Sequence, residues 1–181
     1  DNPGLVPEGW VMNIEGEKGE QGREWCGTSN ECFSKLDEEA EKRTLAFIRK
    51  NAEAKKPFFV SYWPNFLNFM EFQMPKKSVA GLMVADSFPK LDNFVGVLMA
   101  ELKKLGIVEN TLVIAMADNG PMVHSPPAGW GMLPMLYRGG KGDFTEGGVR
   151  VPCIATWPGV IEPGQIVGDI LHVSDLYTTF A

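Results

Sequence analysis

The chain has 181 residues, which suits one domain of ordinary size and leaves little room for a second. Hydrophobic residues make up 44% and charged residues 22%, a composition that excludes wholesale disorder. The formal net charge of −6 leaves no basic surface to neutralise phosphates, so we expect no nucleic-acid partner. No apolar stretch approaches the roughly 18 residues of a membrane span, so we expect no membrane partner and a soluble protein.

Three cysteines are an odd number and form neither a disulfide framework nor a metal-binding knuckle. Cys26 and Cys32 are close enough in sequence for a disulfide, which stays open, and the redox compartment is undecided. The chain begins with Asp1 instead of methionine, and its first residues do not form a signal peptide. We therefore expect a processed chain or a piece of a longer parent.

Residues 1–34 are rich in glycine and charge and predict an irregular N-terminal segment, followed by one α/β domain over 35–181. Apolar periodicity, acidic first turns and Gly or Pro breakers define the elements of that domain. In chain order they are a helix over 37–56, a strand over 58–63, a helix over 87–105, strands over 112–117 and 151–157, and a short helix from 174.

This order predicts a largely parallel sheet with flanking helices, since the run over 112–117 is apolar without alternation, as in buried parallel strands. Ligands of such sheets bind at the carboxyl ends of the strands. Two loops have that place: the loop after Trp63 and the loop after Ala117.

Asp118-Asn119-Gly120 follows the second strand and sets a carboxylate beside a carboxamide on a sharp turn. Both side chains offer oxygen to a hard divalent cation. An ordinary Asx-Gly turn is the competing interpretation.

The segment 138–150 places Lys141 between two glycine pairs, Gly139-Gly140 and Gly147-Gly148. Glycines let backbone and lysine approach a small oxyanion closely. The segment is not a P-loop, because Met135 stands where that motif requires glycine. A solvated glycine loop is the competing interpretation.

Taken in order, these segments resemble the bacterial arylsulfatases of the alkaline-phosphatase superfamily. The resemblance covers residues 37–181 and runs through Lys56-Pro57-Phe58-Phe59-Val60, Asn110-Thr111-Leu112-Val113-Ile114, Asp118-Asn119-Gly120, Gly139-Gly140-Lys141, Glu146-Gly147-Gly148-Val149-Arg150-Val151-Pro152 and Trp157-Pro158-Gly159-Val160.

The resemblance implies hydrolysis of sulfate esters in an intact parent protein at a calcium and formylglycine site. It implies that Asp118 and Asn119 are calcium ligands and that Lys141 is a catalytic residue contacting the sulfate. In the family a histidine near the sulfate ends the loop after the first strand, and Asn68 takes its place here. The resemblance is consistent with a periplasmic or secreted location of the parent protein.

The chain also departs from the family. None of its cysteines begins the Cys/Ser-x-Pro-x-Arg motif that provides the nucleophile, and the paired N-terminal aspartates of the metal site are absent. We therefore expect a partial sulfatase-like domain that is inactive alone. The alternatives are a catalytically dead binding or structural module and a related phosphodiesterase-type metallohydrolase. An open sheet edge predicts a homo-oligomer, unless residues 1–34 cover that edge.

Overall fold

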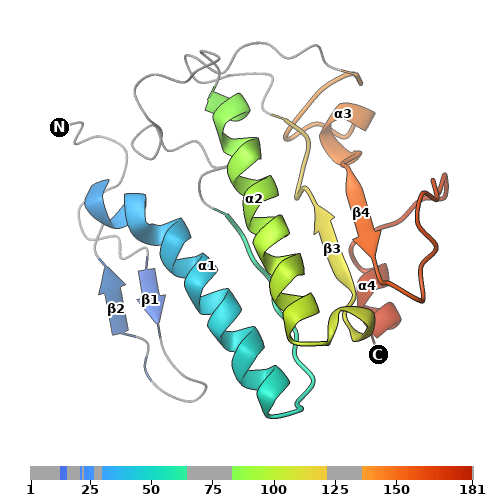
Figure 1. Ribbon diagram of the computed structural model, residues 1–181. Helices are drawn as coiled ribbons and strands as arrows, with labels where there is room; N and C mark the ends of the chain where they lie inside the picture. Colours follow the sequence, from blue (N-terminus) through green and yellow to red (C-terminus); the bar gives the residue numbers. More distant parts are fainter. Residues whose placement is uncertain are drawn as a thin grey trace.

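The computed structural model describes residues 13–15, 21, 23–26, 30–64, 83–121 and 136–180. Helices α1 and α2 lie side by side, with a small sheet on each flank of the pair (Figure 1). In chain order the elements are β1 (Asn13–Glu15), β2 (Arg23–Cys26), α1 (Asn30–Glu53), α2 (Met83–Lys104), the 3-10 helix η3 (Val108–Asn110), β3 (Val113–Met116), α3 (Glu146–Val149), β4 (Cys153–Thr156) and α4 (Asp175–Phe180).

Both long helices begin earlier than predicted. Helix α1 begins at Asn30, so the three acids from Asp37 lie well inside it, and α2 begins at Met83, which places Pro89 in its second turn. Their carboxyl ends agree with the sequence pattern. Gly106 ends α2 with φ +68°, and the Ile107 N–H donates to the Leu102 carbonyl at 3.1 Å, a bonding pattern typical of a glycine-terminated helix.

The core of the described residues lies between the two helices. Ile48 of α1 and Phe94 and Leu102 of α2 are its buried hydrophobic side chains, each at most 3% exposed. An ion pair spans the same interface, with Arg49 Nε 2.6 Å from Glu101 Oε1. Apolar burial supplies most of the free energy here, because an exposed ion pair contributes at most about 1 kcal/mol.

The strand predicted over 58–63 is not one in the structure: the segment is extended and pairs with no described strand. Its side chains still alternate, with Phe58 and Val60 half-buried and Phe59 exposed, the period expected of a strand. The alternation of burial agrees with the sequence pattern, and what is missing among the described residues is a neighbouring strand to bond.

The prediction of a parallel sheet was also wrong for the described residues. Strands β3 and β4 pair antiparallel in the register Val113↔Thr156 to Met116↔Cys153. The apolar run of β3 resembled a strand buried on both faces, but Met116 is 41% exposed. Composition indicated a buried strand and could not show which neighbour lies beside it.

The N-terminal 34 residues are less irregular than expected. They contain β1 and β2, an antiparallel pair, and the first residues of α1. The division at residue 34 therefore falls inside a helix, and nothing in the structure tests it as a domain boundary. The pairing of Cys26 with Cys32 lies outside the described side chains. Across the described parts of the chain, no helix has both the length and the apolar character that a bilayer crossing requires.

Candidate functional site

The turn Asp118-Asn119-Gly120 leaves β3 at its carboxyl end, as predicted. The Asn119 backbone N–H donates to Asp118 Oδ1 at 2.9 Å, and the Asn119 side-chain nitrogen donates to the Gly120 carbonyl at 2.8 Å. Because the amide nitrogen is used inside the turn, the other polar atom of the Asn119 side chain is an oxygen acceptor. The turn therefore presents a carboxylate and an amide oxygen from adjacent residues, with the Asp118 side chain exposed.

The glycine-rich loop folds into a tight turn followed by the short helix α3. The Asp143 N–H donates to the Gly140 carbonyl at 2.9 Å, with Lys141 and Gly142 between them. Gly142 has φ +93°, a backbone conformation that favours glycine at the third position of such a turn. Lys141 itself is exposed at the tip of the turn.

Backbone hydrogen bonds join the two loops into one unit. The Gly120 N–H donates to the Gly148 carbonyl at 2.9 Å, and the Lys141 N–H donates to the Pro121 carbonyl at 2.8 Å. The first bond begins at Gly120, the residue next to Asn119, and the second begins at Lys141, the candidate sulfate contact itself. The structure thus brings Asp118, Asn119 and Lys141 to one end of the β3–β4 sheet.

Glycine is required at this junction because backbone meets backbone. A Cβ atom added to Gly120 would lie 1.8 Å from the Gly147 carbonyl oxygen, and one added to Gly147 would lie 2.1 Å from the Gly139 oxygen. Real Cβ atoms never come so close. The sequence suggested that the glycine pairs around Lys141 let the chain approach an oxyanion and that Gly120 allows a sharp turn. The structure gives them a second role, which is to let the two loops touch.

Arg150, at the end of the glycine-rich loop, contacts two other side chains of the same region. Its Nη1 lies 2.9 Å from Glu146 Oε2, one turn earlier, and its guanidinium carbon is 4.7 Å from the centroid of the Tyr137 ring. The hydrogen bond to Glu146 raises the pKa of Arg150, so the guanidinium stays charged. The sequence analysis included Glu146 and Arg150 in the segment 138–150 but assigned them no role, and Tyr137 lies just outside that segment. The i, i+4 spacing of Glu146 and Arg150 was the available signal.

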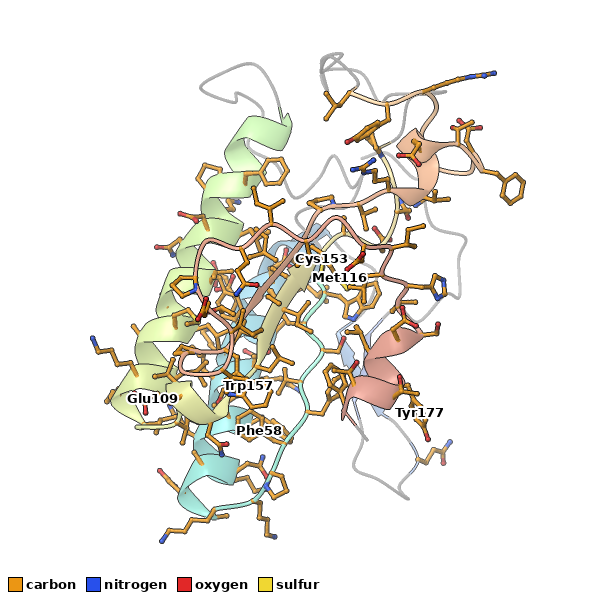
Figure 2. The ribbon with its side chains drawn as sticks, turned by 90° about the vertical axis from the view of Figure 1, so that its right-hand side faces the viewer. Phe58, Glu109, Met116, Cys153, Trp157 and Tyr177 are labelled. Atoms are coloured by element: carbon orange, nitrogen blue, oxygen red, sulfur yellow. The ribbon has the colours of Figure 1, made fainter. Side chains whose placement is uncertain are left out.

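Figure 2 shows which labelled residues lie at each end of the β3–β4 sheet. Met116 and Cys153 mark the end from which the Asp118 turn leaves, and Trp157 and Glu109 lie at the opposite end. There the Trp157 indole N–H donates to the Glu109 carbonyl at 2.9 Å and ties the end of β4 to the segment before β3. The site end is therefore held by backbone contacts between loops and the other end by this side-chain contact.

Two parts of the predicted site are not assembled here. Asn68 lies outside the described residues. Within the described ranges, no group of three or more His, Cys, Asp or Glu side chains is placed to hold a metal ion. Cys153 is a free, exposed thiol on β4, and its sequence context does not match the nucleophile motif.

Comparison with known proteins gives a consistent result. The model of the Sulfatase family matches residues 84–181. Human arylsulfatase A is 38% identical over 148 residues, 78% of this chain and 28% of that protein. Rat steryl-sulfatase is 36% identical over 139 residues, 75% of this chain and 24% of that protein. The chain thus spans about a quarter of the length of these curated relatives.

A solved structure extends the similarity to the fold. The crystal structure of the PsFucS1 sulfatase from a Pseudoalteromonas species superposes with a TM-score of 0.81 at 34% identity. The match covers 92% of this chain and 33% of that one. The described elements are therefore arranged as in part of a larger sulfatase fold. The family match covers more than half of the residues and includes both loops of the candidate site, and the chain belongs to the Sulfatase family.

Proposed function

We propose that this chain contributes part of the active site of a sulfate ester hydrolase. In this proposal Asp118 and Asn119 bind calcium, and Lys141 contacts the sulfate group. The observation that carries the proposal is the hydrogen bond from the Lys141 N–H to the Pro121 carbonyl at 2.8 Å, since Pro121 directly follows the Asp118-Asn119-Gly120 turn. A lysine whose backbone is held next to a turn with two oxygen donors suits an anion that bridges a cation and an ammonium group.

The donor chemistry of the turn fits calcium. Calcium takes about 6–8 oxygen ligands from carboxylates and amide carbonyls, and the turn offers one group of each kind. These two residues cannot replace the hydration shell alone, so the remaining ligands would come from other residues. A bound calcium would supply positive charge that stabilises the negative charge developing on a reacting sulfate ester.

Lys141 would act on the sulfate oxygens. An ammonium group forms short, charge-assisted hydrogen bonds to an oxyanion, and such bonds strengthen as charge develops on the departing oxygen. Asn68 is a second proposed sulfate contact, on the basis of the resemblance alone. The nucleophile is not proposed from this chain, because Cys26, Cys32 and Cys153 all lack the motif that precedes its formation.

The second candidate is a catalytically dead sulfatase-like module with another binding or structural role, which binds no sulfate at this site. A sulfate titration of the isotope-labelled chain, followed by amide chemical shifts, separates the two candidates. We expect saturable shifts at Lys141 and its neighbours that Lys141→Ala abolishes. Lys104→Ala is the matched control, because Lys104 is an exposed lysine at the end of α2, and it should leave the titration unchanged. Shifts that survive Lys141→Ala, or none at all, would reject the sulfate site.

A further inference from the structure

Lys141 owes its position to a four-residue turn whose ends must stay together. The turn runs from Gly140 to Asp143 and is closed by the Asp143 N–H donating to the Gly140 carbonyl at 2.9 Å. A single backbone bond of this kind contributes only about 1 kcal/mol, and many turns of similar shape lack it. A second contact is therefore needed to keep this turn in one conformation.

The Asp143 side chain provides that contact. Its Oδ2 accepts a hydrogen bond from the Gly140 backbone N–H at 2.9 Å. Both backbone polar groups of Gly140, a buried residue, are thus bonded to Asp143. Without the carboxylate the Gly140 N–H would be buried without a partner, which costs about 1–3 kcal/mol.

Neighbouring glycines leave room for Asp143 and restrict it. A Cβ atom on Gly139 would lie 2.7 Å from Asp143 Oδ2, and one on Gly148 would lie 2.1 Å from the Asp143 carbonyl oxygen. The residue is therefore packed against backbone at both its side chain and its main chain. Such packing on two sides limits the positions that the carboxylate can adopt.

Electrostatics alone does not explain an aspartate at this point. A carboxylate two residues from a lysine that binds sulfate repels the anion. The hydrogen bond from the Gly140 N–H to Asp143 Oδ2 gives the carboxylate a favourable geometric contribution that offsets this repulsion. We propose that Asp143 is a positioning residue for Lys141. The Asp143 carboxylate closes the 140–143 turn and thereby holds the Lys141 backbone in place between Gly140 and Pro121. The consequence for sulfate rests on the proposed function, whereas the effect on the turn does not.

Two variants of Asp143 isolate the contribution of the hydrogen bond. Asp143→Asn removes the charge and keeps an oxygen acceptor, and Asp143→Ala removes both, so the two variants have equal charge. Amide hydrogen exchange is measured on the full chain. We expect Gly140 and Lys141 to exchange about tenfold faster in Asp143→Ala than in Asp143→Asn. Amides of α1 and α2 should exchange at the same rate in both variants.

Sulfate titration of the same variants gives the functional readout. Asp143→Asn should bind sulfate at least as tightly as the parent chain, because a repulsive charge is gone. Asp143→Ala should bind about three- to tenfold more weakly than Asp143→Asn. Thr145→Val is the control within the loop, since it loses the hydroxyl bond to the Arg138 carbonyl at 2.7 Å and leaves the 140–143 turn intact. It should keep the exchange rate of the Lys141 amide.

The outcomes separate the two proposals. Equal exchange rates at Gly140 and Lys141 in the Asn and Ala variants would overturn the positioning role, whatever the sulfate data show. Faster exchange in the Ala variant with no sulfate binding in the parent chain would support the positioning of the turn and reject the proposed function. Faster exchange in Asp143→Ala with sulfate affinity equal to that of Asp143→Asn would overturn the claim that the position of Lys141 matters for the anion.

Discussion

Replacing Gly148 by alanine tests the packing around α3, because Gly148 touches the 140–143 turn of its own loop and accepts a hydrogen bond from Gly120 of the other loop. A Cβ atom at this position would lie 2.1 Å from the Asp143 carbonyl oxygen and 2.6 Å from the Gly140 carbonyl oxygen. Carbon and oxygen normally approach to about 3.3 Å, so both backbone segments would have to move. Neither is the flexible end of a side chain, and the added methyl group therefore separates the turn from α3.

The expected cost follows from these distances. Overpacking of a closely packed site costs typically 1–3 kcal/mol. The same movement lengthens the hydrogen bond from the Gly120 N–H to the Gly148 carbonyl, now 2.9 Å, and its loss adds about 1 kcal/mol. We therefore expect Gly148→Ala to lower the free energy of unfolding by about 2–4 kcal/mol, a large part of the stability of a typical domain.

Urea unfolding followed by circular dichroism measures the change, and Gly96→Ala is the matched control. Gly96 is exposed on α2, and a Cβ atom there would have nothing within 4 Å. Alanine inside a helix is more stable than glycine by about 0.5–1 kcal/mol, so this variant should be stabilised. If both variants change the free energy of unfolding by the same amount and sign, the close contact of Gly148 with the 140–143 turn is refuted.

Three further predictions concern activity, pH and assembly. The 181-residue chain alone should hydrolyse no aryl sulfate, because it carries no nucleophile motif; metal-dependent turnover traced to the chain itself would contradict this. Burial, and then the charge of Asp37, raises the pKa of Glu41 above its ordinary 4.5, so the folded chain holds that proton more tightly than the unfolded chain. The free energy of unfolding should then fall as pH rises through this raised pKa. Urea titrations between about pH 4 and pH 7 should show a smaller fall for Glu41→Gln than for the parent chain. An identical fall in both would refute the assignment of this pH dependence to Glu41. We also propose self-association through the edge of β4 that no described strand covers, beside which Ile154 offers a 69% exposed apolar side chain, and a monomer at every concentration in sedimentation would exclude it.

The sequence predicted local structure better than pairing. The helix end at Gly106 and the strand end before Asp118 agree with the structure, because glycine and Asx residues act within a few positions of themselves. The antiparallel pairing of β3 with β4 was missed, since an apolar run carries no information about its neighbour's direction. Segment 58–63 has the alternation of a strand but no described partner.

The sequence identified the residues of the candidate site but not the backbone contacts that bring them together. Asp118, Asn119 and Lys141 were singled out by residue type and by the resemblance. Their approach depends on hydrogen bonds between Gly120 and Gly148 and between Lys141 and Pro121, which join positions about 20–30 residues apart. The only sequence signal of such a contact between distant backbone segments is glycine. A glycine in the sequence does not show whether it is needed for close packing or for backbone flexibility.

The central claim is that the Asp118 turn and the Lys141 loop form one site for a cation and an oxyanion together. It is tested most directly by measuring the sulfate affinity at the Lys141 amide with and without millimolar calcium, at matched ionic strength. Calcium should bind weakly to the chain and tighten the binding of sulfate. Asp118→Ala should abolish that tightening, and its calcium-free sulfate affinity should be equal to or higher than that of the parent chain, because a repulsive charge is gone. Sulfate affinity that is indifferent to calcium, or a calcium effect that survives Asp118→Ala, would contradict the claim.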